Sequence, residues 1–145
     1  MFFSKSAQQI RRILLVEDEP LLAFDAEHAL QQAGYEVVAT VDRFRDATTV
    51  ILGQGGIDLV ITDIRLRGVR SGVELARHAR ELGIAVLFAT ATCPEEAAGQ
   101  GIALGCLAKP FQPQDLVRAI AVCERLVGGL PPGRLPPGLR LFPRD

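Results

Sequence analysis

Short apolar runs alternate with helical patterns along most of this chain of 145 residues. This alternation constrains the fold more than any other feature, because it is typical of βα units that build a parallel sheet. It predicts an α/β fold with a doubly wound, five-stranded parallel sheet. The predicted strands cover residues 12–16, 35–39, 57–62, 84–89 and 106–108.

Helix boundaries are marked by residues with well-understood backbone preferences. Pro20 suits the first position of a helix, and Gly34 suits the position just after its end. Ser71 followed by Glu74 forms a capping-box pattern that predicts the start of another helix. Further helices are expected over 43–52 and 113–127.

A helix is also expected over 94–104, although Gly99 and Gly101 lie within it. Each interior glycine costs about 1 kcal/mol relative to alanine, so this helix should be the least stable of the five. We therefore expect that a signal at the site described next changes the order of residues 91–104.

Polar residues follow the predicted strands where each strand ends. Glu17-Asp18-Glu19 follow the first strand and Asp63 follows the third, while Thr90 and Lys109 follow the fourth and fifth. Parallel α/β sheets bind ligands outside the carboxyl ends of their strands, so these groups should share one crevice. Clustered carboxylates repel one another unless a hard cation such as Mg²⁺ lies between them. A metal, a hydroxyl and an ammonium together predict a site that holds a phosphoryl group.

In this combination the chain resembles the response-regulator receiver domain of two-component signalling, over residues 12–127. The resemblance implies a flavodoxin-like (βα)5 fold with strand order 2-1-3-4-5. It also implies a stand-alone regulator whose only catalysis is its own phosphotransfer and dephosphorylation. The motifs that carry it occur in the family's order and read VEDEP, DLVITDIRL, SGVELA, LFAT and AKPF.

The resemblance assigns a role to each candidate residue. Asp63 would accept a phosphoryl group from a sensor histidine kinase or a histidine phosphotransfer protein. Asp18, Asp63 and the backbone carbonyl of Arg65 would bind Mg²⁺ directly, and Glu17 through water. Thr90 would bond a phosphoryl oxygen after transfer.

Lys109 would pair with the phosphoryl oxygens, and with Asp63 before transfer. The Lys109-Pro110 bond resembles the family's cis peptide. Glu19 is interpreted only as a carboxylate that the dipole favours at a helix start.

One position departs from the family pattern. Cys106 stands three residues before the lysine, where relatives carry Tyr or Phe. Phe88-Ala89-Thr90 resembles the start of the motif of a stand-alone subgroup without that aromatic, and this likeness implies a histidine kinase of the HWE type. The next residues do not continue the motif.

Composition limits the partners and the compartment. The formal net charge is -1, so no electrostatic footprint for nucleic acid is present. The longest apolar runs are far shorter than the ~20 residues of a membrane span, and no signal peptide is recognised. We therefore expect a cytoplasmic protein. The three cysteines lack metal-ligand spacing and are interpreted as small buried hydrophobes in a reducing compartment.

The two ends lie outside the predicted domain. Residues 1–11 are interpreted as an N-terminal extension and 128–145 as a tail rich in Pro and Gly. Its repeated Leu-Pro-Pro-Gly disfavours both helix and sheet ladder, which favours a disordered tail. Leu139, Leu141 and Phe142 instead favour a docking segment.

Two alternative functions fit the same predicted fold. A receiver-like interaction module could act without phosphorylation, as Cys106 suggests, but such a module would not need the acidic cluster and Lys109. A flavin-binding protein of the same fold would need a phosphate-binding loop after the first strand, where this chain has carboxylates.

Overall fold

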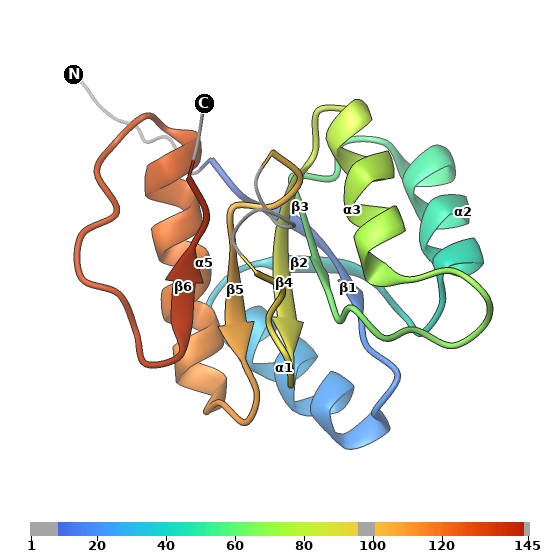
Figure 1. Ribbon diagram of the computed structural model, residues 1–145, viewed down its shortest axis with the longest axis horizontal. Helices are drawn as coiled ribbons and strands as arrows, with labels where there is room; N and C mark the ends of the chain where they lie inside the picture. The colour runs from blue at the N-terminus through green and yellow to red at the C-terminus, as the bar shows by residue number, and fades with distance from the viewer. Residues whose placement is uncertain (1–8, 96–100, 144–145) are drawn as a thin grey trace.

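The computed structural model describes residues 9–95 and 101–143, in which six strands form one sheet in the order β2-β1-β3-β4-β5-β6 (Figure 1). The first five strands are parallel, which confirms the predicted fold class and strand order, and β6 is antiparallel to β5. The strands are β1 (Arg12–Val16), β2 (Glu36–Val41), β3 (Leu59–Thr62), β4 (Ala85–Thr90), β5 (Gly105–Ala108) and β6 (Leu139–Leu141). The described helices are α1 (Pro20–Gln32), α2 (Phe44–Gln54), α3 (Gly72–Glu81) and α5 (Pro113–Val127).

Helices cover both faces of the sheet, α1 and α5 on one side and α2 and α3 on the other (Figure 1). Alternate residues of each strand point to opposite faces. In β1, Ile13 and Leu15 therefore pack with α1 and α5, whereas Leu14 and Val16 pack with α2 and α3. Because both faces are buried, the strands are apolar almost throughout.

The helix signals in the sequence are confirmed. The Ser71 hydroxyl accepts a hydrogen bond from the Glu74 backbone N–H, and Glu74 Oε1 accepts one from the Ser71 N–H, both at 3.3 Å. Pro20 begins α1, and Gly34 follows its end with φ of 96°. The predicted second strand was too short, because β2 continues alongside β1 until Val41 pairs with Val16.

The predicted helix over 94–104 is wrong at the ends that the structure describes; residues 96–100 lie outside the described residues. Pro94 and Glu95 are not helical. Gly101 has φ of 82°, a left-handed conformation that an α-helix does not contain. The Leu104 N–H donates to the carbonyl of Val86 at 2.8 Å, so the chain there already aligns with β4. The expected change of order in this segment stays a prediction.

The disordered-tail interpretation is wrong for the described part of residues 128–143. After the last proline of the repeat, Leu139–Leu141 pairs with β5, and the Phe142 N–H donates to Leu104 O at 3.0 Å. The Phe142 ring is 3% exposed and lies edge-on to Phe88, with 6.5 Å between the ring centroids. The alternative interpretation, a docking segment, is therefore correct, and the surface it docks on belongs to the same molecule. The prolines end before the β5–β6 pairing begins, and Leu139 and Phe142, which follow them, are buried.

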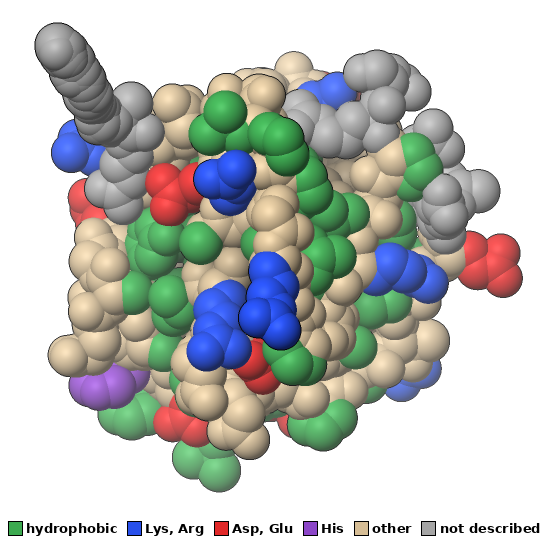
Figure 2. Space-filling model, turned by 90° about the vertical axis from the view of Figure 1, so that its left-hand side faces the viewer, with side chains coloured by type: hydrophobic (Ala, Val, Ile, Leu, Met, Phe, Trp, Pro, Cys, Tyr) green, Lys and Arg blue, Asp and Glu red, His purple; other side chains and the backbone are tan. Residues whose placement is uncertain are grey.

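Two side-chain contacts attach the chain ends to α5. Arg125 Nε donates to the carbonyl of Pro131 at 2.7 Å, which fixes the tail where it crosses the helix. Figure 2 shows this face, where basic side chains stand among apolar ones. Ile10 is fully buried, and its N–H donates to Glu124 Oε2 at 3.4 Å. The folded unit therefore extends beyond the predicted 12–127 at both ends.

The cysteine interpretation is wrong for two of the three residues. Cys93 and Cys106 form a disulfide bond, whereas Cys123 is free and buried. The two bonded residues are separated by 13 positions in the sequence. They meet because β5 lies beside β4, a proximity that no local pattern of residues encodes.

Within residues 9–95 and 101–143, the structure contains no helix that is long and apolar enough to cross a bilayer.

We predict that Phe142→Ala lowers the free energy of unfolding by about 3 kcal/mol, because it leaves a cavity beside Phe88. Urea denaturation followed by circular dichroism measures the change. Leu130→Ala, in the same tail but with a side chain that is 53% exposed, is the control and should change it by less than about 0.5 kcal/mol. Equal small effects from both would mean that β6 does not stabilise the sheet.

Candidate functional site

Adjacent strand ends bring four carboxylates together. Val16 pairs with Thr62 at the ends of β1 and β3, so Glu17 and Asp63, the next residues, emerge side by side. Glu17, Asp18, Glu19 and Asp63 each place a carboxylate oxygen within 4.8 Å of the others. Glu17 and Asp63 are buried, which removes much of the water that would screen their repulsion.

Lys109, just after β5, reaches into the middle of this cluster. Its Nζ lies 2.7 Å from Glu17 Oε1, 2.8 Å from Asp63 Oδ2 and 3.0 Å from Glu19 Oε2. The peptide bond that follows, Lys109-Pro110, is cis, as the family resemblance implies. One ammonium therefore binds carboxylates from two strand ends at once.

Glu19 is the member of this site that sequence reasoning missed. It does precede α1, but its side chain makes no cap hydrogen bond and instead binds Lys109. Its backbone N–H donates to Glu17 Oε2 at 3.0 Å, which orients the Glu17 carboxylate. The sequence feature that could have identified Glu19 as part of the site is its place in one acidic run with Glu17 and Asp18.

Burial and charge oppose each other in this cluster. Burial raises the pKa of the Glu17 carboxyl, although the Lys109 ammonium and the Glu19 N–H partly offset that effect. Burial alone would lower the pKa of Lys109, but its hydrogen bonds to Asp63, Glu17 and Glu19 outweigh burial and raise that pKa above its ordinary value. Lys109 is therefore charged at neutral pH.

Thr90 and Arg65 lie at the edges of the cluster. Thr90 is the buried last residue of β4, and its carbonyl accepts a hydrogen bond from the Lys109 N–H at 2.9 Å. The Arg65 backbone N–H donates to Asp63 Oδ1 at 3.2 Å, and its side chain is exposed. The predicted metal contact of its carbonyl stays a prediction.

Gly72 packs directly against the backbone of Asp63. A Cβ atom at Gly72 would lie 1.9 Å from the Asp63 carbonyl oxygen, closer than any non-bonded contact allows. The Gly72 N–H also donates to the Ile64 carbonyl at 2.7 Å. Only glycine permits α3 to begin this close to the loop that follows β3.

The donor set fits a hard divalent cation. The cluster offers only carboxylate oxygens, the ligands that Mg²⁺ prefers. Three of its four members, Glu17, Glu19 and Asp63, also form an ion pair with Lys109. Among the described residues, Glu17, Asp18, Glu19 and Asp63 form the group that could hold such an ion. Of these, Asp18 makes no ion pair with Lys109.

Comparisons with known proteins agree with this geometry. Residues 13–121 match the family model of the response regulator receiver domain. The chain is 35% identical to the Bacillus subtilis transcriptional regulatory protein YrkP over 119 residues, 79% of this chain and 50% of YrkP. It is 32% identical to the Pseudomonas aeruginosa phosphate regulon regulator PhoB, over 81% of this chain and 53% of PhoB. The chain thus spans about half the length of these relatives.

Solved structures show the same fold. The chemotaxis response regulator CheY4 of Vibrio cholerae superposes with a TM-score of 0.67 at 28% identity, covering 77% of this chain and 97% of CheY4. A response regulator receiver protein of Sinorhizobium medicae gives a TM-score of 0.68 at 29% identity, with 79% and 94% covered.

We predict that Gly72→Ala lowers the free energy of unfolding by about 2 kcal/mol, because the new methyl group displaces the backbone of Asp63. The control is Gly53→Ala in α2, where an added Cβ meets no atom within 4 Å. That change should raise stability by up to about 1 kcal/mol. Chemical denaturation of both variants measures the difference, and an unchanged Gly72→Ala protein would contradict the close approach.

We predict that Asp18→Asn leaves the metal-free fold intact and more stable by up to about 1 kcal/mol, because it removes one of several mutually repelling carboxylates. It should also reduce the stabilisation that added Mg²⁺ produces. Thermal melts with a chelator and with Mg²⁺ test both effects, with Asp25→Asn on exposed α1 surface as control. A clear loss of stability in the chelator would make Asp18 a structural residue.

Proposed function

We propose that this chain, which belongs to the response regulator receiver domain family, accepts a phosphoryl group on Asp63 from a sensor histidine kinase or a histidine phosphotransfer protein. The observation that carries the proposal is the position of Asp63. Its Oδ2 lies 2.8 Å from Lys109 Nζ, within a cluster of carboxylates that could hold Mg²⁺. The proposal includes a cytoplasmic location, because the phosphohistidine donor of such a kinase would have to reach Asp63 there.

The chemistry requires little more than positioning and neutralisation of charge. A carboxylate oxygen of Asp63 attacks phosphorus in line with the phosphohistidine nitrogen, whose bond to phosphorus breaks as the acyl phosphate forms. Mg²⁺, held by Asp18, Asp63 and Glu17, would neutralise charge on the phosphoryl oxygens. The bound Mg²⁺ would supply the positive charge that a phosphoryl group on Asp63 needs, because three other carboxylates lie beside it.

Lys109 and Thr90 supply the remaining contacts. The Lys109 ammonium already touches the Asp63 oxygen, so it is placed to pair with a phosphoryl group attached there. The Thr90 hydroxyl, at the end of the adjacent β4, donates a hydrogen bond to a phosphoryl oxygen after transfer. The kinase is of the HWE type if the Phe88-Ala89-Thr90 likeness extends to partner choice.

The signal leaves through altered protein–protein contacts. Thr90 is the last residue of β4 and Lys109 follows β5 directly, so their rearrangement changes the surface formed by β5, α5 and the segment after β4. A module that acts without phosphorylation is less well supported. Nothing in such a module would require a lysine and two carboxylates to be buried together.

We predict that the protein gains one acid-labile phosphoryl group from acetyl phosphate only when Mg²⁺ is present, and that Asp63→Asn abolishes this gain. The physical reason is that the amide has neither the charge nor the nucleophilic oxygen of the carboxylate. Intact mass spectrometry at fixed times measures it. Asp25→Asn, on exposed α1 surface, should behave as wild type. Uptake by Asp63→Asn at the wild-type rate would overturn the assignment.

A further inference from the structure

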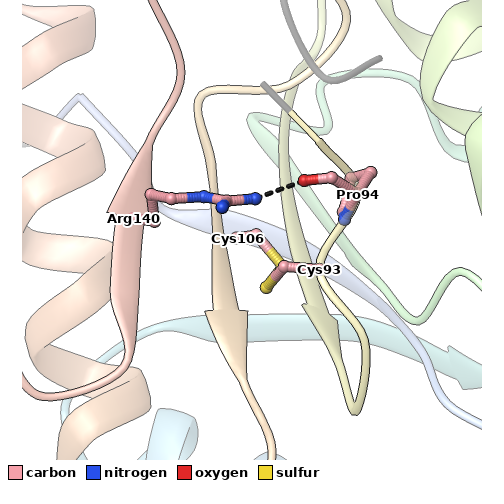
Figure 3. The surroundings of a disulfide bond; sticks show 4 residues. All are labelled: Cys93, Pro94, Cys106 and Arg140. Atoms are coloured by element: carbon pink, nitrogen blue, oxygen red, sulfur yellow. Dashed lines mark hydrogen bonds between the residues drawn. A yellow bond between two sulfur atoms is a disulfide. The ribbon is translucent and has the colours of Figure 1, made fainter. Parts of the chain in front are cut away.

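The Cys93–Cys106 disulfide joins the segment after β4 to the interior of β5 (Figure 3). The two Cα atoms lie 5.9 Å apart. Cys106 is fully buried in the cluster that contains Phe88 and Phe142, whereas Cys93 is only partly buried. The two sulfur atoms therefore differ in access: a small reagent in solution meets Cys93 first.

The two cysteines lie in the sequence between Thr90 and Lys109, the two residues that would contact a phosphoryl group. Cys93 follows Thr90 by three residues, and Cys106 precedes Lys109 by three. The Lys109 N–H bonds to the Thr90 carbonyl at 2.9 Å, so the strand ends are already joined by one hydrogen bond. The disulfide adds a covalent link on the same pair of segments. While it is intact, movement of the chain after Thr90 relative to β5 is restricted.

Arg140 extends this link to the tail. Arg140 pairs with Cys106 in the β5–β6 ladder, and its guanidinium donates a hydrogen bond to the carbonyl of Pro94, the residue after Cys93 (Figure 3). The guanidinium carbon also lies 5.8 Å from the centroid of the Phe142 ring. The segment after β4 is thus held by β5 covalently and by β6 through a hydrogen bond.

We propose that Cys93 and Cys106 form a reversible thiol–disulfide pair, oxidised by a small-molecule disulfide such as glutathione disulfide, and that oxidation slows phosphoryl acceptance at Asp63. The second half of this proposal rests on the proposed function. The phosphoacceptor site would thereby respond to a second, chemically distinct signal.

The exchange balances in two steps. The Cys93 thiolate, formed by loss of a proton, attacks one sulfur of glutathione disulfide; a mixed disulfide forms and one glutathione thiolate leaves. The Cys106 thiolate, having lost its proton, then attacks the Cys93 sulfur and expels the second glutathione thiolate. Two protein thiols are oxidised, one glutathione disulfide is reduced to two glutathiones, and the two protons pass to the leaving thiolates.

Cys123 provides an internal reference for this chemistry. It is fully buried in the other hydrophobic cluster, with α1 and α5. Burial raises the pKa of its thiol to about 12, so almost no thiolate is present at neutral pH. Cys106 is equally buried, but its sulfur lies beside that of Cys93, whereas Cys123 belongs to the other cluster. Cys123 should therefore remain a free thiol while the other two exchange.

The expected direction follows from where the disulfide holds the chain. The disulfide restricts movement of the chain after Thr90 relative to β5. In the proposed function the Thr90 hydroxyl bonds a phosphoryl oxygen only after transfer, so the disulfide hinders any rearrangement that forms this contact. Oxidation should therefore disfavour the phosphorylated state. Linkage is reciprocal, so occupancy of the site should make the disulfide easier to reduce.

The test uses the full chain in two preparations, one treated with glutathione disulfide and one with a dithiol, each then freed of reagent. Alkylation after denaturation, read by intact mass, should find one free thiol in the first preparation and three in the second. Acetyl phosphate with Mg²⁺ should then phosphorylate the reduced form about fivefold faster than the oxidised form, which corresponds to a difference of about 1 kcal/mol in activation free energy.

Two variants serve as controls. Cys93→Ser removes the partly buried thiol and should phosphorylate at the reduced wild-type rate after either treatment. Cys123→Ala leaves the pair intact and should keep the difference between the two forms. Circular dichroism confirms that each variant is folded.

Each part of the proposal would be contradicted by a different experimental result. Three alkylated thiols after glutathione disulfide treatment would overturn the pair, and equal rates in forms with one and three free thiols would overturn its coupling to Asp63. Phosphoryl uptake in neither form, with the thiol counts as expected, would overturn the proposed function and the coupling that rests on it.

Discussion

The contacts of the Lys109 ammonium with Glu17, Glu19 and Asp63 are the interaction on which the site depends. Four carboxylates within 4.8 Å would strongly destabilise a partly buried pocket if no positive charge compensated them. The ammonium supplies that charge, and its Nζ also touches the oxygen that we propose as nucleophile. The β1–β3 register, the position of β5 and the opening of α3 at Gly72 all serve to bring these groups together.

The strand β5, which delivers Lys109, is fixed from both sides. It pairs with β4 on one side and with β6 on the other, and the disulfide ties it to the segment after β4. Phe142 from the tail packs beside Phe88 in the cluster that contains Cys106, so the tail supplies aromatic bulk to the cluster in which this cysteine is buried. The unusual cysteine and the unusual tail are therefore parts of one local arrangement.

Two inputs then converge on the same few residues. Thr90 and Lys109 would contact a phosphoryl group, and Cys93 and Cys106 lie three residues away from them along the same two segments. Rearrangement at the phosphoacceptor and exchange at the disulfide would both act on the joint between β4 and β5. Arg140 connects this joint to β6, which places the tail among the elements that respond.

Local patterns in the sequence were sufficient for the five parallel strands, the capped start of α3, the exact extent of α5 and the acidic strand ends that form the site. Each depends on residues close together in the chain: short continuous apolar runs, Ser71 with Glu74, and Pro113 at a first turn. Other features required the tertiary structure. The disulfide, the ladder of β6, the burial of Phe142 and the contact of Glu19 with Lys109 each join residues whose proximity exists only after the sheet has formed. A disulfide or a strand pair is specified by distance in space, and distance along the chain does not encode it.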